Sequence, residues 1–281
     1  MTTSSSKNTG DAFLDLMSRD SRQRASLARA LKSEKDLRRQ ALEMPPPKLP
    51  KLRARGFDLI AEVKFRSPSN GDLGRTRNDP QEAQRIAHNY ASAGAAMVSI
   101  LTQPSAFRGS LEHLRRVAQD CPIPVMRKDF LMDTYQVWEA RAAGADCVLV
   151  VMRILSEGGA AELLDACREA GMLALIEVFD AQDLQRAKQL LSTRRSQQVL
   201  LGINNRNLSN LEIDLSRCMQ LIGGLPEGVA AVAESGLESP RDVAQMAAGG
   251  FRLALVGSAL MRSASPQNLI RSMLLAGRTA R

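Results

Sequence analysis

The stretch Ala140-Arg-Ala-Ala-Gly144-Ala-Asp-Cys-Val148 runs from a helical pattern through a glycine into an apolar strand. Glycine readily adopts the left-handed conformation that ends an α-helix, so this stretch is typical of a joint between a helix and the strand after it. The same pattern recurs at residues 90–98, 167–175 and 246–254. Four joints of one kind indicate a chain built from repeated helix–strand units.

Eight short runs rich in Val, Ile, Leu and Ala are predicted to form buried parallel strands, and a helical pattern follows each of them. The predicted strands are residues 57–64, 96–102, 123–129, 147–152, 173–178, 199–204, 229–234 and 253–257. The predicted helices are residues 80–93, 110–119, 134–143, 157–170, 181–192, 215–223, 239–248 and 266–276. Eight βα units with short connections favour a closed (β/α)8 TIM barrel over an open doubly wound sheet, which usually has fewer strands.

Residues 1–56 are expected to form a basic helical extension in front of a barrel domain at residues 57–281. Helical periodicity runs through residues 11–43, and the proline-rich residues 44–50 then stop any helix. The extension holds 13 of the basic and 6 of the acidic residues, and so carries most of the net charge of +8. Phe13 is its only aromatic residue, so a solvated basic face is a simpler interpretation than a nucleic-acid platform. An anion-attracting role stays open, as does the question whether the extension covers the catalytic mouth.

Composition argues against several other classes of protein. No apolar run approaches the roughly 18 residues of a membrane span, and the polar N-terminus lacks a signal or transit pattern, so we expect a cytoplasmic protein without membrane contact. No C-x-x-C spacing is present, and both histidines fall in predicted helices, which argues against a metal site, a disulfide framework or a histidine triad. The cysteines are Cys121, Cys147, Cys167 and Cys218, and the histidines are His88 and His113.

Charged and amide side chains gather where the predicted strands end, which in a (β/α)8 barrel is the place of the active site. Glu62 and Lys64 alternate to the same face of the first strand, and a structural ion pair is the simplest alternative for these two alone. Asp129 and Asn205 alternate away from their neighbours and are expected to make structural bonds. The other strand-end groups are Arg127, Lys128, Glu177, Asn204, Arg206 and Glu234. Charges converging on one mouth would stabilise a barrel poorly, so they favour a functional site.

Small residues follow the last two predicted strands, as Ser235-Gly236 and Gly257-Ser258. In such barrels the backbone N–H groups of these two loops commonly bind phosphate. A tight turn without a ligand is the alternative for either pair taken alone. The presence of both pairs in the two expected loops predicts a phosphate site.

The candidate groups are two lysines, several carboxylates and an arginine, with no histidine, cysteine or metal-ligand cluster among them. This set is typical of acid–base chemistry on a phosphorylated, negatively charged substrate, with lysine as the acid and glutamate as the base. A Schiff base on Lys64 or Lys128 is the rival chemistry. The residues alone leave this choice open, and we expect neither a metal nor a cofactor.

At these same residues the chain resembles the indole-3-glycerol phosphate synthase family. The similarity spans roughly residues 57–262, is not visible in residues 1–56, and departs at Phe179, where the family pattern leads us to expect histidine. The matching motifs include Ile60-Ala-Glu-Val-Lys64, Phe107-Arg-Gly-Ser110, Pro124-Val-Met-Arg-Lys-Asp-Phe130, Ile176-Glu-Val178, Gly202-Ile-Asn-Asn-Arg-Asn-Leu208, Val232-Ala-Glu-Ser-Gly236 and Val256-Gly-Ser-Ala-Leu-Met261.

The resemblance implies a carboxy-lyase of tryptophan biosynthesis that closes 1-(2-carboxyphenylamino)-1-deoxy-D-ribulose 5-phosphate to indole-3-glycerol phosphate, with loss of carbon dioxide and water. It implies that Lys128 is the general acid for ring closure and Glu177 the general base. Lys64 would pair with substrate anions, and either lysine could be the acid of the second step. Glu62 and Asn204 would orient these groups. The implied substrate-binding residues are Arg206 near the carboxylate, Phe107, Phe130 and Leu208 around the aromatic ring, and Ser67, Ser235, Gly236, Gly257 and Ser258 around the phosphate.

Two further hypotheses compete with this function. A phosphoribosyl isomerase with a similar barrel would not need two lysines on the first and third strands. A scaffold or sensor that keeps only phosphate binding would have no physical reason to retain so many costly charges. Monomer and weak homo-oligomer both stay open, as does contact with other enzymes of the tryptophan pathway.

Overall fold

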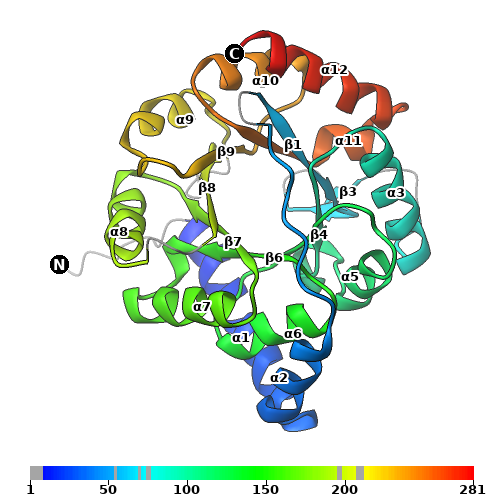
Figure 1. Cartoon of the computed structure of the whole chain (residues 1–281), viewed down its shortest axis with the longest axis vertical. Coiled ribbons are helices and arrows are strands. Elements are labelled where there is room, and N and C mark those ends of the chain that lie inside the picture. Colours follow the sequence, from blue (N-terminus) through cyan, green and yellow to red (C-terminus); the bar gives the residue numbers. More distant parts are fainter. Residues whose placement is uncertain (1–8, 54–55, 69–70, 74–76, 195–197, 207–211) are drawn as a thin grey trace, which may run out of the picture.

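Eight parallel strands close into a barrel in the computed structural model, which describes residues 9–53, 56–68, 71–73, 77–194, 198–206 and 212–281 (Figure 1). Around the barrel the order is β1-β10-β9-β8-β7-β6-β5-β4, so each strand neighbours the next one in the chain and β1 pairs with β10. The strands are β1 (Asp58–Val63), β4 (Met97–Leu101), β5 (Val125–Lys128), β6 (Cys147–Val151), β7 (Leu173–Val178), β8 (Val199–Asn204), β9 (Ala230–Glu234) and β10 (Leu253–Val256). The predicted TIM barrel is confirmed, with every strand end within two residues of its expected place.

Helices follow the strands and cover the outside of the barrel (Figure 1). They are α3 (Pro80–Ser92), α5 (Leu111–Ala118), α6 (Thr134–Ala142), α7 (Glu157–Glu169), α8 (Ala181–Ser192), α9 (Ser216–Leu221), α10 (Pro240–Ala248) and α12 (Pro266–Thr279). Side-chain caps begin many of them: Asp79 accepts a hydrogen bond from Glu82 N at 2.8 Å, and Asp180 accepts one from Asp183 N at 2.9 Å. Such caps satisfy N–H groups that have no partner inside a helix.

Several short elements in the loops were not predicted. They are the antiparallel pair β2 (Arg66–Ser67) and β3 (Gly71–Asp72), the helices α4 (Pro104–Phe107) and α11 (Ser258–Arg262), and the 3-10 turns η1 (Met152–Ile154) and η2 (Ile222–Gly224). Each has at most five residues, which is too short for periodicity to reveal. Both α4 and α11 lie after strands at the end of the barrel where the polar residues gather.

The barrel interior is filled by apolar side chains that alternate with residues facing the helices. On four of the strands, the inward-facing residue two positions further along is charged instead of apolar. The changes are Ile60 to Glu62, Met126 to Lys128, Leu175 to Glu177 and Val232 to Glu234. The alternation that builds the core therefore also delivers four charged groups to one end of the barrel.

Helices α1 (Thr9–Leu31) and α2 (Glu34–Glu43) precede the first strand, as the N-terminal periodicity predicts. In Figure 1 α1 lies behind the barrel, while the segment after α2 crosses the near end of the barrel on its way to β1. Tyr135 on α6 donates its hydroxyl to Ala28 O at 3.0 Å and to Lys32 O at 3.1 Å. The extension is thus joined to the barrel at α6.

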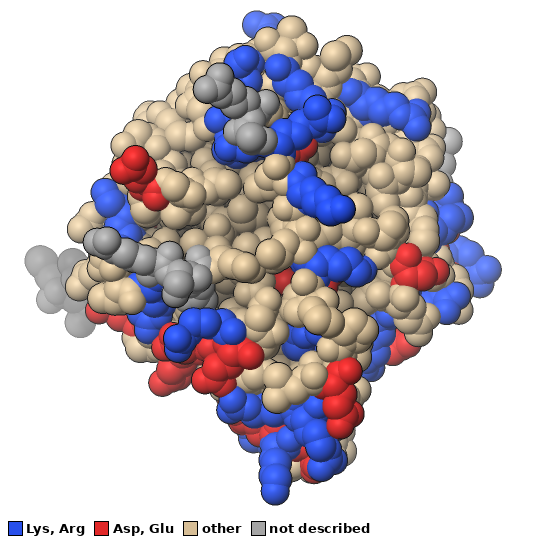
Figure 2. Space-filling model, in the orientation of Figure 1, with Lys and Arg blue, Asp and Glu red and all other residues tan. Residues whose placement is uncertain are grey.

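The positive charges of the extension are interleaved with acids and pair with the barrel (Figure 2). Arg29 lies 2.6 Å from Asp133, and Arg38 pairs with Glu169. Both contacts tie α1 and α2 to the helices beside them, so part of the basic charge is neutralised where it lies. Among the described residues, no helix is both long and apolar enough to cross a membrane.

Candidate active site

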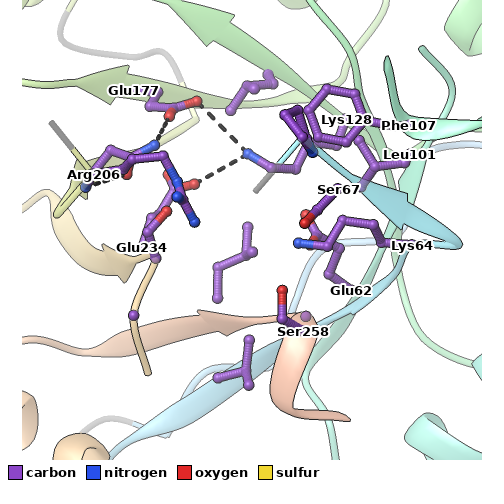
Figure 3. Close-up of a pocket in the computed structure, with 18 of the residues that line it drawn as sticks. Glu62, Lys64, Ser67, Leu101, Phe107, Lys128, Glu177, Arg206, Glu234 and Ser258 are labelled. Atoms are coloured by element: carbon purple, nitrogen blue, oxygen red, sulfur yellow. Dashed lines mark hydrogen bonds and ion pairs between the residues drawn. The ribbon is translucent and has the colours of Figure 1, made fainter. Parts of the chain in front are cut away.

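One pocket collects the carboxyl ends of the barrel strands (Figure 3). Thirteen of the fourteen predicted site residues line it, and Leu208 lies outside the described residues. The thirteen are Glu62, Lys64, Ser67, Phe107, Lys128, Phe130, Glu177, Asn204, Arg206, Ser235, Gly236, Gly257 and Ser258. The fold therefore brings the predicted residues to one place, while their roles stay predictions.

Lys128 at the end of β5 faces two carboxylates from the opposite strands (Figure 3). Its Nζ lies 3.3 Å from Glu234 Oε2 and 3.7 Å from Glu177 Oε2. Burial lowers the pKa of Lys128, but the negative charges of Glu177, Glu234 and Glu62 outweigh burial and raise that pKa above its ordinary value. Lys128 is therefore a cation at neutral pH and holds a proton inside the pocket.

Glu234 is the charged residue that the sequence hypothesis left without a role. Burial, helped by the charge of Glu177, raises its pKa to about 8 against the opposing effect of Lys128. One carboxylate oxygen, Oε1, is buried and has no hydrogen-bond partner in the part of the chain that the structure describes. Its position had placed Glu234 among the strand-end groups, and the structure adds it to the lining of the pocket beside Lys128.

Glu177 is oriented by a chain of hydrogen bonds along β8. Asn204 Nδ2 donates to Glu177 Oε1, and Arg206 N donates to Asn204 Oδ1 at 2.9 Å. Both polar atoms of the Asn204 amide therefore form hydrogen bonds, and its Nδ2 fixes one oxygen of Glu177. The other oxygen of Glu177 faces Lys128. Burial lowers the pKa of Arg206 below its ordinary value, with Glu62 opposing this effect.

Glu62 and Lys64 do form the ion pair that was the simplest alternative for them, with 2.8 Å between Lys64 Nζ and Glu62 Oε2. Both side chains also line the pocket, and Figure 3 shows them across the cavity from Glu177 and Glu234. The ion pair is therefore part of the candidate site and does not replace it.

Three phenylalanines form an aromatic wall. Phe107 and Phe130, which the sequence places around an aromatic ring, have ring centroids 6.3 Å apart. Phe13 of α1 meets Phe130 edge to face at 6.1 Å, and Phe13 and Leu14 both line the pocket. The N-terminal helix thus covers one side of the mouth, which the sequence had left open.

A buried ion pair anchors α1 next to Lys128. Arg24 donates from Nη1 and Nη2 to the two oxygens of Asp129, at 2.9 and 2.8 Å. Asp129 also accepts the Thr102 hydroxyl at 2.7 Å and lies 3.2 Å from Arg127 Nη2. Burial raises the pKa of Asp129, but Arg127 and Arg24 outweigh it and hold that pKa below its ordinary value. The structural role expected for Asp129 is present, and it extends to the N-terminal helix.

The turn after β9 places two consecutive residues in the left-handed region, Ser235 with φ 65° and Gly236 with φ 80°. Successive turns of this kind gather backbone N–H groups in a concave surface suited to an anion. Asn205 Nδ2 donates to Ser235 O at 3.2 Å and supports the turn, as expected for a side chain that points out of the site. Gly257 caps the short helix α11, which begins at Ser258 on the same rim of the pocket.

Phe179 lines the pocket where histidine was expected, and the Arg153 guanidinium lies 5.7 Å from the centre of its ring. His88 and His113 lie on α3 and α5 and do not line the pocket. All four cysteines are buried as free thiols. Within the described ranges, no three His, Cys, Asp or Glu side chains are grouped so that they could hold a metal ion.

Comparison with known proteins extends the resemblance. The family model described as Indole-3-glycerol phosphate synthase matches residues 17–273. The expectation that the N-terminal segment lacks the family pattern is therefore wrong from residue 17 onward.

Curated relatives and solved structures agree with this match. The indole-3-glycerol phosphate synthase of Nocardioides sp. is 42% identical over 240 residues, which cover 85% of this chain and 88% of the relative. That of Kineococcus radiotolerans is 42% identical over 223 residues, covering 79% and 78%. The crystal structure of 3-hexulose-6-phosphate synthase from Salmonella typhimurium aligns with a TM-score of 0.64 at 16% identity, over 80% of this chain and all of the other, and shows the shared fold alone. The chain belongs to the indole-3-glycerol phosphate synthase family.

Proposed function

We propose that this chain is an indole-3-glycerol phosphate synthase, a carboxy-lyase that converts 1-(2-carboxyphenylamino)-1-deoxy-D-ribulose 5-phosphate to indole-3-glycerol phosphate, carbon dioxide and water. The observation that carries the proposal is Lys128, a buried ammonium held between Glu177 and Glu234 in a pocket with an aromatic wall. A protonated lysine beside a carboxylate provides the general acid and the general base that the reaction needs.

Ring closure joins the carboxylate-bearing carbon of the aromatic ring to the ketone carbon of the sugar. The ketone oxygen becomes a hydroxyl by taking the proton of Lys128, whose cationic form stabilises the negative charge that develops there. Carbon dioxide then leaves, and the electrons of its bond return to the ring. Lys128 regains a proton from water before the next turnover, and the negative charges of the adjacent glutamates favour its charged form.

Dehydration completes the indole. The new hydroxyl leaves as water, taking a proton from an acid, and Glu177 removes one proton from the ring that becomes aromatic. Asn204 supports this role, because its amide fixes one oxygen of Glu177 and leaves the second for the proton. Lys64 and Lys128 are the two ammonium groups of the site that can supply the acid.

Substrate recognition divides between the two halves of the pocket. The aromatic ring of the substrate would lie against Phe107 and Phe130, and its carboxylate near Arg206. The phosphate would bind the rim formed by Ser67 and the loops after β9 and β10, where Ser235 and Gly236 form a left-handed turn. This division would hold the reacting carbon atoms near Lys128.

The direct test supplies the purified full chain with the carboxyphenylamino ribulose phosphate and follows indole fluorescence together with release of carbon dioxide. Saturable formation of both products in equal amounts is the expected result. Folded protein that forms neither product would overturn the proposal, and product formation that requires an added metal would contradict the metal-free acid–base mechanism.

A cytoplasmic location and a monomeric or weakly oligomeric state stay predictions for this enzyme, as does contact with other enzymes of the pathway. Cell fractionation and analytical ultracentrifugation of the purified chain would test the first two, and co-sedimentation with the enzymes before and after it in the pathway would test the third.

A further inference from the structure

Two buried carboxylates of the site lie directly over glycines of neighbouring strands. A Cβ atom added to Gly202 of β8 would lie 3.0 Å from Glu234 Cδ and closer still to Glu234 Oε1. A Cβ atom added to Gly257 after β10 would lie 2.9 Å from Glu62 Cδ and closer still to Glu62 Oε2. Such approaches are shorter than carbon–carbon contact distances, so each carboxylate occupies space that any other residue would fill.

The backbone of Gly202 does not itself require glycine. Its φ lies outside the left-handed region, since the positive-φ glycines lie elsewhere in the chain, and it pairs in regular parallel register between Glu177 and Val232. Glycine inside a strand costs about 0.5–1 kcal/mol relative to alanine. Apart from Glu234, the nearest atom to the added Cβ is Leu175 Cδ1 at 3.3 Å, the end of a flexible side chain. Glycine is required at residue 202 because the Glu234 carboxylate occupies the space that a side chain would fill.

Glu234 depends on this space because hydrogen bonds fix it only on one side. Its Oε2 accepts from Lys128 Nζ at 3.3 Å, whereas Oε1 is buried and has no hydrogen-bond partner among the described residues. Only 1% of the residue is exposed to solvent. Packing against the bare Cα of Gly202 is therefore what sets the orientation of Oε1.

We propose that Gly202 is a positioning residue, which seats the Glu234 carboxylate against β8 and so sets its contact with Lys128. The inference rests on the proposed function for its kinetic consequences, but the geometry stands independently. A methyl group at residue 202 would push the carboxylate toward the pocket and change the electrostatic field at the Lys128 ammonium.

The test compares Gly202→Ala with the parent in kcat, KM and the pH dependence of kcat. We expect kcat to fall on the order of 100-fold, as for other small displacements of catalytic groups, with a smaller change in KM and a displaced pH profile. Gly158→Ala is the matched control, because a Cβ atom added to Gly158 on the exposed end of α7 meets no atom within 4 Å. A purely structural role would lower stability and leave the pH profile in place.

A double-mutant cycle identifies the partner of Gly202. In the Glu234→Ala background, Gly202→Ala is expected to change neither kcat nor KM further, because the colliding carboxylate is gone. The inference would be overturned if Gly202→Ala lowered kcat equally in the parent and in the Glu234→Ala background. It would also be overturned if Gly202→Ala alone kept the kinetics of the parent. If Gly202→Ala alone fails to fold, a folded double variant supports the positioning role of Gly202. Failure of both variants to fold overturns that role.

A crystal structure of Gly202→Ala separates this inference from the proposed function. Displacement of the Glu234 carboxylate supports the seat even if the parent shows no indole formation, an outcome that would overturn only the proposed function. A carboxylate that keeps its place beside an added methyl group would contradict the seat, whatever the activity of the parent.

Discussion

Lys128 retains its proton because other strands surround it with negative charge. Burial of an ammonium would by itself favour the neutral amine, yet Glu177 and Glu234 lie within 4 Å and reverse that preference. Burial is the main cause of the high pKa of Glu234, and the negative charge of Glu177 adds to it, since one ammonium does not fully compensate two carboxylates. Acid strength in this site is thus a property of the cluster.

The titration of Glu234 predicts a pH-dependent stability. Its pKa of about 8 lies above the ordinary carboxyl value of 4.5, so between these values the folded chain holds a proton that the unfolded chain has lost. This contribution to stability is present at low pH and is lost as pH rises toward 8. We therefore expect Glu234→Gln to gain free energy of unfolding relative to the parent from pH 5 to pH 8.5, measured by urea unfolding.

The control for this prediction is Glu157→Gln, which makes the same substitution at the exposed start of α7, outside the pocket. A constant difference between Glu234→Gln and the parent across the same pH range would contradict the assigned titration.

Most side chains of the pocket could be placed from the sequence, because strand alternation is local. Glu62, Lys128 and Glu177 follow apolar residues at a spacing of two, and the spacing alone sends them into the barrel mouth. The effect of each charge on the pKa of the others could not be predicted, because it depends on which strands bring their side chains together in the barrel. Glu234 went without a role for that reason.

At the scale of elements, α1 is a wall of the pocket joined to the strand that carries Lys128. Arg24 and Asp129 are 105 residues apart in sequence and make a bidentate ion pair beside Lys128. Phe13, on the same helix, packs against Phe130 and completes the aromatic wall. Periodicity predicted the helix itself, but no local pattern indicates such distant partners, which is why its place over the mouth was left open.

This contact predicts a joint effect on stability and substrate affinity. Arg24→Met removes both charge-assisted bonds to the buried Asp129 and is expected to cost about 2 kcal/mol of stability, with a several-fold rise in KM as α1 loosens. Thermal unfolding and steady-state kinetics measure the two effects. Arg22→Met on the exposed face of the same helix is expected to behave like the parent. An unchanged KM in a destabilised Arg24 variant would show that α1 does not contribute to the pocket.

At the scale of the whole molecule, the two ends of the barrel have separate tasks. The carboxyl ends of the strands hold the site, while the opposite end joins the segment before β1 to the last helix, α12. Asp58 at the start of β1 accepts from Arg278 of α12 at 3.0 Å and from Arg53 N at 3.1 Å. Asp58 is 4% exposed, so these bonds satisfy an otherwise costly buried carboxylate.

The separation predicts a variant that loses stability and keeps activity. Arg278→Met leaves Asp58 without its cationic partner and is expected to cost about 1–3 kcal/mol in urea unfolding, with kcat and KM unchanged below the transition. Arg271→Met, exposed on the same helix, is the control and should match the parent in both measurements. A fall in kcat for folded Arg278→Met would show that the two ends are coupled.

The eight-stranded architecture could be predicted because glycine joints and apolar runs are repeated local signals. The strand at residues 199–204 was predicted with the bounds that it has in the structure. The short helices of the rim and the β2–β3 pair could not be predicted, because they depend on tertiary contacts over a few residues. The same limit applies to Gly202, whose importance depends on a side chain from the neighbouring strand.

The most direct test of the account is the turnover of Lys128→Ala with the carboxyphenylamino ribulose phosphate, followed by indole fluorescence. Loss of the general acid is expected to lower kcat by about 10²–10⁴-fold in folded protein. Lys188→Ala, exposed on α8, is expected to retain parental turnover. Parental turnover by a folded Lys128→Ala variant would contradict the central claim that this lysine starts the reaction.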